Sequence, residues 1–147
     1  MRGIEFIADV GYSDVLNTLL EGISLHDYDF YISEEEVFSK QKLPEISKKV
    51  DQKLLDSFRA CGSYYMFFLN LQAYPPNVQK QSIITYDDFE NSNCQFIILI
   101  VDGQYFEIYV KDDQLLLKFI KNAIKLHGQK ITIKSDYEDG RTRMSMQ

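Results

Sequence analysis

Hydrophobic residues follow strand-like patterns in several short segments of the chain. In residues 4–8 every second side chain is apolar, which is typical of a strand with one buried face. Residues 28–32 predict a second strand. Residues 64–74 are almost continuously apolar, which predicts a strand covered on both faces near the centre of a sheet. Residues 82–86 predict a further strand, whereas the acidic and polar residues 87–93 predict a loop.

Apolar residues at spacings of three and four predict three helices, over residues 13–22, 44–62 and 112–128. The expected helix starts are Ser13, Pro44 and either Asp112 or Asp113, and each range ends at a glycine. The stripes expected to be buried are Val15, Leu16, Leu19 and Leu20; Ile46, Val50, Leu54, Phe58 and Cys61; and Leu116, Phe119, Ile120, Ala123 and Ile124. Ser33 and Glu36 have the spacing of a capping box, which predicts a further short helical turn.

The clearest local signal is Asp102-Gly103, a dipeptide favoured in two-residue hairpin turns, between the apolar segments 96–101 and 105–110. Such a turn pairs Val101 with Gln104. The same register places Leu99 opposite Phe106, Ile97 opposite Ile108, and Ile98 opposite Glu107. We therefore expect one face of this hairpin to lie in the core.

The C-terminal segments 131–138 and 141–146 flank Asp139-Gly140 in the same format and predict a second hairpin. Its register pairs Glu138 with Arg141 and Asp136 with Arg143. Two arginines spaced by one residue also suit bidentate binding of a phosphate or carboxylate. We favour the structural interpretation, in which each arginine has an acidic partner, and keep Arg141 and Arg143 as binding candidates.

These elements predict one α+β domain over residues 1–147, with a mixed or antiparallel sheet of five to seven strands and about three helices mainly on one face. A length of 147 residues and a hydrophobic content of 45% fit one domain with a substantial core. The sequence contains no tandem repeat and no segment with the composition of a linker.

The net charge of −6 arises entirely in residues 1–44, where nine acidic residues face three basic ones. The rest of the chain is balanced, with thirteen of each sign and no basic stripe, so we expect no nucleic-acid partner. The candidate acidic residues are Asp27, Asp29, Glu34, Glu35 and Glu36. They form either a solvated rim, which we favour, or a surface that attracts a basic protein partner.

The longest purely apolar run, residues 96–101, is far shorter than the roughly 20 residues of a membrane-spanning helix. The N-terminus has no segment of signal-peptide type, so we expect a cytoplasmic protein without a membrane anchor. Cys61 and Cys94 are then expected to be reduced thiols in or near the core.

The sequence contains none of the short motifs that carry a known catalytic mechanism, and we predict no catalytic residue, no metal and no cofactor. His26-Asp27-Tyr28-Asp29 contains ligand-type side chains, but strand alternation would place the histidine on the opposite face from the aspartates. His127 is expected in the last turn of the third helix, where the helix dipole favours a protonated imidazole.

Five tyrosines are a further candidate group, because their hydroxyls could line a groove along one sheet face. These are Tyr64, Tyr74, Tyr86, Tyr105 and Tyr109. Core packing with hydrated hydroxyl tips is the favoured interpretation of this group.

Short blocks spread over the whole chain resemble a bacterial domain-of-unknown-function family of small proteins from spore-forming bacilli. They are residues 28–32 together with Arg2-Gly3-Ile4-x-Phe6, Tyr64-Tyr65, Ser92-x-Cys94-Gln95, Ile100-Val101-Asp102, Tyr109-x-Lys111-Asp112 and Asp139-Gly140-Arg141-Thr142-Arg143. The resemblance implies a bacterial, single-domain, intracellular protein and no particular activity, and residues 33–60 and 75–91 contribute nothing to it.

Two functional hypotheses follow. The first is a small non-enzymatic protein that binds a protein partner through the acidic surface of its N-terminal part. The alternative is a small-molecule binder, or a modest enzyme, with a pocket lined by Tyr and Phe between the sheet and the helices. The chain is expected to be a monomer, or a homodimer formed through an uncovered sheet edge or face.

Overall fold

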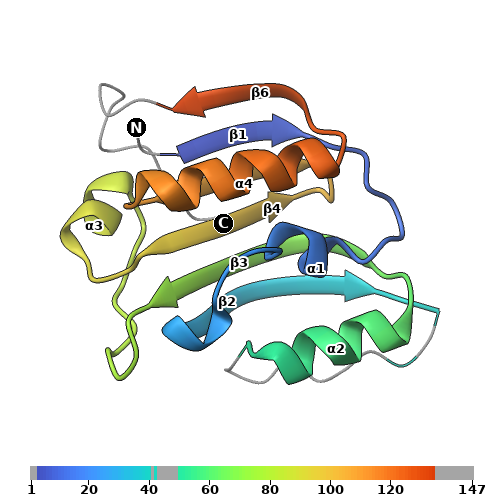
Figure 1. Ribbon diagram of the computed structural model, residues 1–147, viewed down its shortest axis with the longest axis horizontal. Helices are drawn as coiled ribbons and strands as arrows, with labels where there is room; N and C mark the ends of the chain where they lie inside the picture. The colour runs from blue at the N-terminus through green and yellow to red at the C-terminus, as the bar shows by residue number, and fades with distance from the viewer. Residues whose placement is uncertain (1–2, 41, 43–49, 135–147) are drawn as a thin grey trace.

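The computed structural model describes residues 3–40, 42 and 50–134, and these residues form helices around one antiparallel sheet (Figure 1). The strand order is β2-β3-β4-β5-β1-β6. The strands are β1 (Gly3–Ile7), β2 (Asp29–Phe38), β3 (Tyr65–Tyr74), β4 (Phe96–Val101), β5 (Tyr105–Val110) and β6 (Gln129–Lys134). The helices are α1 (Val15–Leu19), α2 (Gln52–Cys61), α3 (Tyr86–Asn91) and α4 (Asp113–Lys125), with a 3-10 turn at Leu25–Asp27. The predicted α+β class and a sheet of five to seven strands are confirmed.

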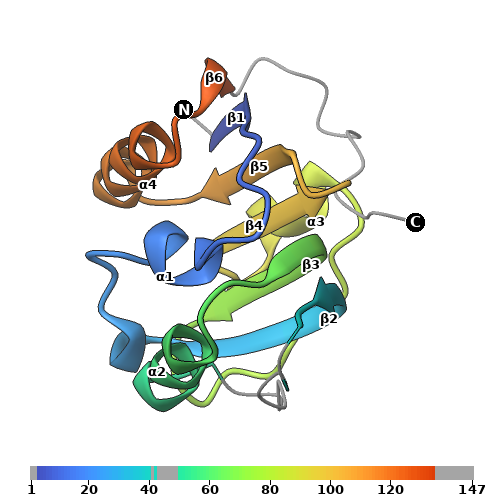
Figure 2. The ribbon, with the colours of Figure 1, turned by 90° about the vertical axis from the view of Figure 1, so that its right-hand side faces the viewer.

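The helices lie mainly on one face of the sheet, as predicted, with α1, α2 and α4 on that face and α3 on the other (Figure 2). The larger core fills the space between the sheet and the three helices; at its centre lie Phe96, Phe119, Ile98 and Ile108, all fully buried. A smaller core packs α3 against the opposite face through Phe89 and its neighbours on β3, β4 and β5. Both faces of the central strands are therefore covered at the α3 end, which explains the continuous apolar runs of β3 and β4.

The hairpin of β4 and β5 forms where Asp102-Gly103 predicts it, but its predicted register is wrong by one residue. Asp102 and Gly103 both have positive φ, and Val101 pairs with Tyr105 rather than with Gln104. The extra residue is held from outside the hairpin, because the carbonyl of Gln104 accepts the Ala8 N–H and the N–H of Gly103 reaches the Phe67 carbonyl. Ile98 consequently pairs with Ile108, and the carboxylate of Glu107 faces the other side beside Leu99.

Strand β2 continues through the predicted helical turn at residues 33–38, so that prediction is wrong. Val37 pairs with Met66 and packs against the larger core, and the ladder to β3 absorbs register shifts near Ser33 and Phe67. Pairing with a long buried strand therefore outweighs the local capping signal.

The second and first helices begin at caps other than those predicted. Asp51 is the N-cap of α2, with an extended backbone and a carboxylate that accepts the Leu54 N–H at 2.9 Å, so Val50 precedes the helix. The predicted start at Pro44 and the stripe residue Ile46 lie outside the described residues. In α1 the N-cap position is Asp14, because Ser13 pairs with Tyr64 in an isolated β-bridge.

The segment 82–93 reverses the prediction, since residues 82–84 form no strand and α3 occupies most of the predicted loop. The cause is a capping box in which the Thr85 hydroxyl accepts the Asp88 N–H and the Asp88 carboxylate accepts the Thr85 N–H. Phe89 then anchors the helix in the smaller core.

Helix α4 forms as predicted after the Asp112 cap, but its buried face is rotated relative to the predicted stripe. Leu115 and Asn122 are buried, whereas Ile124 is 61% exposed. The side-chain amide of Asn122 donates to the carbonyls of Leu19 and Glu21, which ties α4 to the end of α1. The prediction that His127 lies in the last helical turn is wrong, because α4 ends at Lys125 and His127 follows it in the left-handed conformation, with φ +58°. The predicted C-terminal hairpin from residue 135 onward, including Arg141 and Arg143, lies outside the described residues.

Candidate protein-binding edge

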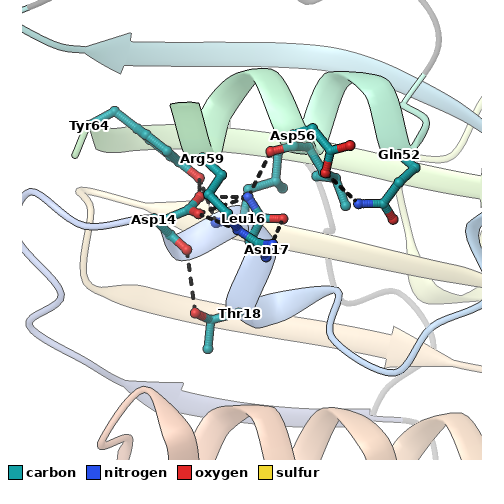
Figure 3. Close-up of polar contacts among 9 residues, drawn as sticks. Asp14, Leu16, Asn17, Thr18, Gln52, Asp56, Arg59 and Tyr64 are labelled. Atoms are coloured by element: carbon teal, nitrogen blue, oxygen red, sulfur yellow. Dashed lines mark hydrogen bonds and ion pairs between the residues drawn. The ribbon is translucent and has the colours of Figure 1, made fainter. Parts of the chain in front are cut away.

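The entry into β3 is held by a buried tyrosine that connects it to α1 (Figure 3). The Tyr64 hydroxyl donates to Asp14 Oδ1 at 2.6 Å and accepts the Leu16 N–H at 3.0 Å. Burial, followed by the hydrogen bond to Asp14, raises the pKa of Tyr64 well above its usual range, so the phenol stays neutral.

Helix α2 joins the same network through Arg59 and the Leu55 carbonyl, which both contact Asn17 of α1. Asn17 donates to both carboxylate oxygens of Asp14 and to the Leu55 carbonyl, while Arg59 donates to Asn17 Oδ1 and lies 3.7 Å from Asp14 Oδ2 (Figure 3). These contacts connect α1, α2 and β3. Because Ser13 pairs with Tyr64, the preceding Tyr12 is placed beside Tyr65.

Five rings lie in contact where β2 ends and β3 begins, and we call them the aromatic row: Tyr12, Phe38, Tyr65, Phe67 and Phe68. Ring centroids are 5.7 Å apart for Tyr12 and Tyr65, 6.0 Å for Tyr65 and Phe67, 6.3 Å for Phe38 and Phe67, and 4.6 Å for Phe67 and Phe68. Tyr12 is 54% and Phe38 46% exposed. Contacting rings that remain this exposed form an apolar surface on an otherwise polar edge.

The predicted acidic residues lie along β2 and just before it, not in one compact patch. Asp27 ends the 3-10 turn, and the carboxylate of Asp29 accepts the Asn77 N–H at 2.9 Å, which gives it a structural role. The backbone of Glu34 pairs with Asn70, and the exposed Glu35 and Glu36 follow it.

Strand alternation divides the acids between the two faces of the sheet. Glu36 and Phe38 share one face, so the Glu36 carboxylate lies on the same side as the aromatic row, whereas Glu35 is on the helix-covered face with Val37. The protein atoms around Glu35 desolvate its carboxyl and raise its pKa. Asp102, at the tip of the β4–β5 hairpin, is a further exposed acid near the row, because its carbonyl accepts the Tyr65 hydroxyl at 3.3 Å.

Strand β2 is the last strand of the sheet on its side, and within the described residues only β3 pairs with it. Its backbone N–H and C=O groups on the outer side are therefore available for pairing with an added strand. Acidic side chains on such an edge also oppose indiscriminate strand pairing, which is a purely structural reason for Glu35 and Glu36.

Two cavities with mixed polar and apolar linings border the helices on this side of the molecule. One, of about 460 Å³, is lined by Tyr12, Lys40 and Cys61 among others, and the Cys61 thiol lies 3.6 Å from the Ser39 hydroxyl. The other, of about 610 Å³, lies between the Leu25–Asp27 turn and the start of α2 and includes Asp29 and Asp51. Neither is the Tyr- and Phe-lined pocket expected between the sheet and the helices.

The other residues considered from the sequence have structural surroundings. Of the five candidate tyrosines, all but Tyr105 are buried, so core packing is confirmed for four of them and no groove of hydroxyls forms. The prediction that strand alternation separates His26 from Asp27 is wrong, because both lie in the 3-10 turn, 3.4 Å apart. In the described part of the chain, no three His, Cys, Asp or Glu residues group as metal ligands. Both cysteines are free and buried, as expected.

Comparison with known proteins now places the chain in a family. The family model described as a protein of unknown function (DUF2691) matches residues 1–145. The chain belongs to the DUF2691 family. The resemblance to a bacterial family of unknown function, which the short sequence blocks indicated, is therefore confirmed.

A relative of this DUF2691 protein is the uncharacterized protein YncE of Bacillus subtilis (strain 168), 24% identical over 151 residues that cover 99% of each chain. No solved structure matches the chain. No helix in the described ranges is both long enough and apolar enough to cross a membrane.

Proposed function

We propose that this protein is a non-enzymatic binding protein, and that the aromatic row with the acids beside it holds a basic segment of a protein partner. The observation that carries the proposal is a row of contacting rings, of which Tyr12 and Phe38 are about half exposed, at the end of an acidic edge strand. Aromatic residues supply much of the binding energy in protein interfaces, and exposed carboxylates beside them select a positive partner.

The chemistry of the partner follows from the charges around the row. Glu36 and Asp102 are exposed next to it, and Lys40 is the cation nearest to Tyr12 among the residues that line the adjoining cavity. A lysine or arginine side chain from the partner can pair with these carboxylates and stack on an exposed ring. The outer edge of β2 can at the same time hydrogen-bond to an extended backbone.

A capture experiment with matched variants tests this proposal. The immobilised wild-type protein is incubated with bacterial lysate at low and high salt, in parallel with the double variant Tyr12→Ser, Phe38→Ser and with Glu36→Lys. The controls are Ile84→Ser, since Ile84 is also 50% exposed, and Glu90→Lys on α3, at the opposite end of the sheet from the row (Figure 1).

We expect a basic protein that the wild type and both controls retain at low salt, and that the two edge variants lose. Raising the salt should also weaken its retention. Capture that survives both edge variants, or the absence of any protein meeting these criteria, would contradict the proposal.

A further inference from the structure

A separate cavity of about 330 Å³ lies over β1, β5 and β6, away from the three helices. The side chains that matter for its chemistry are Glu5, Ile7, Tyr105, Glu107, Lys130 and Thr132. Its volume is at the small end of ligand pockets, which suits a molecule the size of an amino acid. It shares no residue with the aromatic row.

Two carboxylates face each other in this cavity across neighbouring strands, because Glu5 and Glu107 are directly paired in the β1–β5 ladder. Lys134, whose side chain is only 8% exposed, places its ammonium 3.4 Å from Glu5 Oε2 and 3.2 Å from Glu107 Oε2. The buried Tyr109 hydroxyl donates to the same Glu107 oxygen at 2.6 Å. One ammonium therefore serves two carboxylates, and their combined charge stays negative.

Burial alone would lower the pKa of Lys134, but the hydrogen bond with Tyr109 and the charge of Glu107 outweigh it and raise the pKa. The ammonium therefore stays charged beside the two carboxylates of the cavity. Glu5 and Glu107 remain 47% and 37% exposed, and within the described residues the Oε1 atom of each carboxylate accepts no hydrogen bond. Two acceptors therefore face solvent in a confined space.

The start of β6 contributes a positive charge to the cavity. Lys130 is exposed and forms no ion pair with another described residue, and it lies two residues from Thr132, which pairs with Glu5. The ladder between β1 and β6 shifts register between Glu5 and Ile7, and Lys130 has φ +53° at this irregularity. The Thr132 hydroxyl donates to the Lys130 carbonyl at 3.1 Å, so it is engaged within the strand. An accessible cation, the Lys130 ammonium, therefore borders the carboxylate pair.

We propose that this cavity binds a small zwitterion of the α-amino acid class, with its ammonium at Glu5 and Glu107 and its carboxylate at the ammonium of Lys130. The ring of Tyr105, 46% exposed, and the side chain of Ile7 form the apolar wall for the remaining part of the ligand. This inference is independent of the proposed protein-binding function, since the two sites have no residue in common.

Ligands of one sign fit this cavity less well. A purely anionic molecule meets two carboxylates, and a purely cationic one leaves Lys130 without a partner while approaching the Lys134 ammonium. A metal ion is opposed by the same ammonium, which lies between the two carboxylates that the described residues contribute to the cavity. A zwitterion satisfies both ends at once.

The test uses the full-length protein and a defined set of probes in calorimetry and thermal-shift measurements. The twenty standard amino acids are compared with ethylamine, propionate and glycine betaine, which lack the carboxylate, the amine and the N–H donors respectively. We expect at least one amino acid to bind with a measurable Kd and to raise Tm, and the three analogues to bind at least about 10-fold more weakly.

Variants then locate the binding site. Glu5→Gln and Lys130→Gln should each weaken binding of that amino acid about 10-fold or more, whereas Glu90→Gln and Lys80→Gln, outside the cavity, should not. Lys130→Gln is the decisive variant if Glu5→Gln lowers stability, because Lys130 has no ion pair within the described structure that its loss would break.

Absence of binding by all twenty amino acids would overturn the proposal, as would unchanged affinity in both cavity variants. Equal binding of ethylamine would replace the zwitterion with a simple cation. Amino acid binding that stays intact in the edge variants would leave this inference standing, whether or not the wild type captures a protein partner.

Discussion

At the scale of single residues, Gly3 lies where two strands approach too closely for any side chain. A Cβ atom at this position would be 2.1 Å from the Ile108 carbonyl oxygen and 3.1 Å from the Tyr109 Cα atom. Both are backbone atoms of β5, so no rotamer change can relieve the overlap. The glycine is therefore required for β1 to pair with β5 on one side and β6 on the other.

We expect Gly3→Ala to lower the free energy of unfolding by about 3 kcal/mol, because the β1–β5 ladder must open locally. Gly11→Ala is the control, since nothing lies within 4 Å of its added Cβ and only its left-handed conformation carries a cost of about 1 kcal/mol. Urea denaturation measures both, and equal losses in the two variants would contradict the explanation.

Tyr64 gives a second prediction at this scale. Removing its hydroxyl in Tyr64→Phe leaves the Leu16 N–H and the Asp14 carboxylate without the partner that each has in the wild type. We expect a loss of about 1–3 kcal/mol in unfolding free energy. Tyr65→Phe is the matched control, because its more exposed hydroxyl makes only a 3.3 Å contact to the Asp102 carbonyl. A similar loss in both variants would show that the network does not stabilise the fold.

At the scale of elements, helix α3 depends on the Asp88 carboxylate. Hydrogen bonds from the Ile84 and Thr85 N–H groups lower the pKa of Asp88 below its ordinary value of 3.8. A carboxyl whose pKa is lower in the folded state stabilises the protein above its unfolded pKa, and this contribution disappears as the pH falls through the folded value. The capping box is therefore expected to weaken only in acid.

We expect Asp88→Asn to make the unfolding free energy less dependent on pH below about pH 4 than it is in the wild type. Asp87→Asn, in the same helical turn, serves as the control. Denaturation curves from neutral pH down to about pH 3 measure the two slopes. A wild-type slope in the Asp88→Asn protein would mean that the cap does not contribute to acid sensitivity.

The hairpin of β4 and β5 shows how an element is modified by its neighbours. Its turn has positive φ at both Asp102 and Gly103, as the dipeptide indicates. The register nevertheless differs, because backbone groups of the turn bond to Phe67 and Ala8 in other segments. A sequence window restricted to the hairpin contains no information about those partners.

At the scale of the whole molecule, Lys134 connects three strands from distant parts of the chain. It lies on β6 and forms ion pairs with both Glu5 of β1 and Glu107 of β5, which face each other directly. Its raised pKa means that this stabilisation is complete below the ordinary value of 10.5 and disappears only as the pH rises through the folded value. The wild type should therefore show no change from this lysine around neutral pH.

We expect Lys134→Met to lower the free energy of unfolding at neutral pH by about 2–3 kcal/mol, since two partly buried carboxylates then face each other without a counter-ion. Part of the loss should be recovered in the double variant Lys134→Met, Glu5→Gln, which removes one of the two facing charges. The control is Lys118→Met, on the exposed face of α4. A loss that is just as large in the double variant would point to packing rather than charge.

The sequence by itself determined the elements whose signals are local and repeated. Helix α4, the long strand β3, the Asp102-Gly103 turn and the α+β class all follow from periodicity, turn chemistry and composition. Periodicity is local because a helix or strand must repeat its buried side at its own period. The acidic content of β2 was likewise visible in the sequence, although its division between two faces was not.

Only the tertiary structure decided the rest, because it depends on contacts between residues far apart in the chain. Pairing with β3 turned residues 33–38 into a strand, and a capping box with a buried Phe89 turned an acidic loop into α3. The aromatic row brings Tyr12 together with Phe38 and Phe67. Lys134 contacts Glu5 only because β6 and β1 are neighbours in the sheet. Burial of apolar surface stabilises such long-range contacts, but no local sequence pattern predicts them, because their free energy depends on which faces of the elements meet.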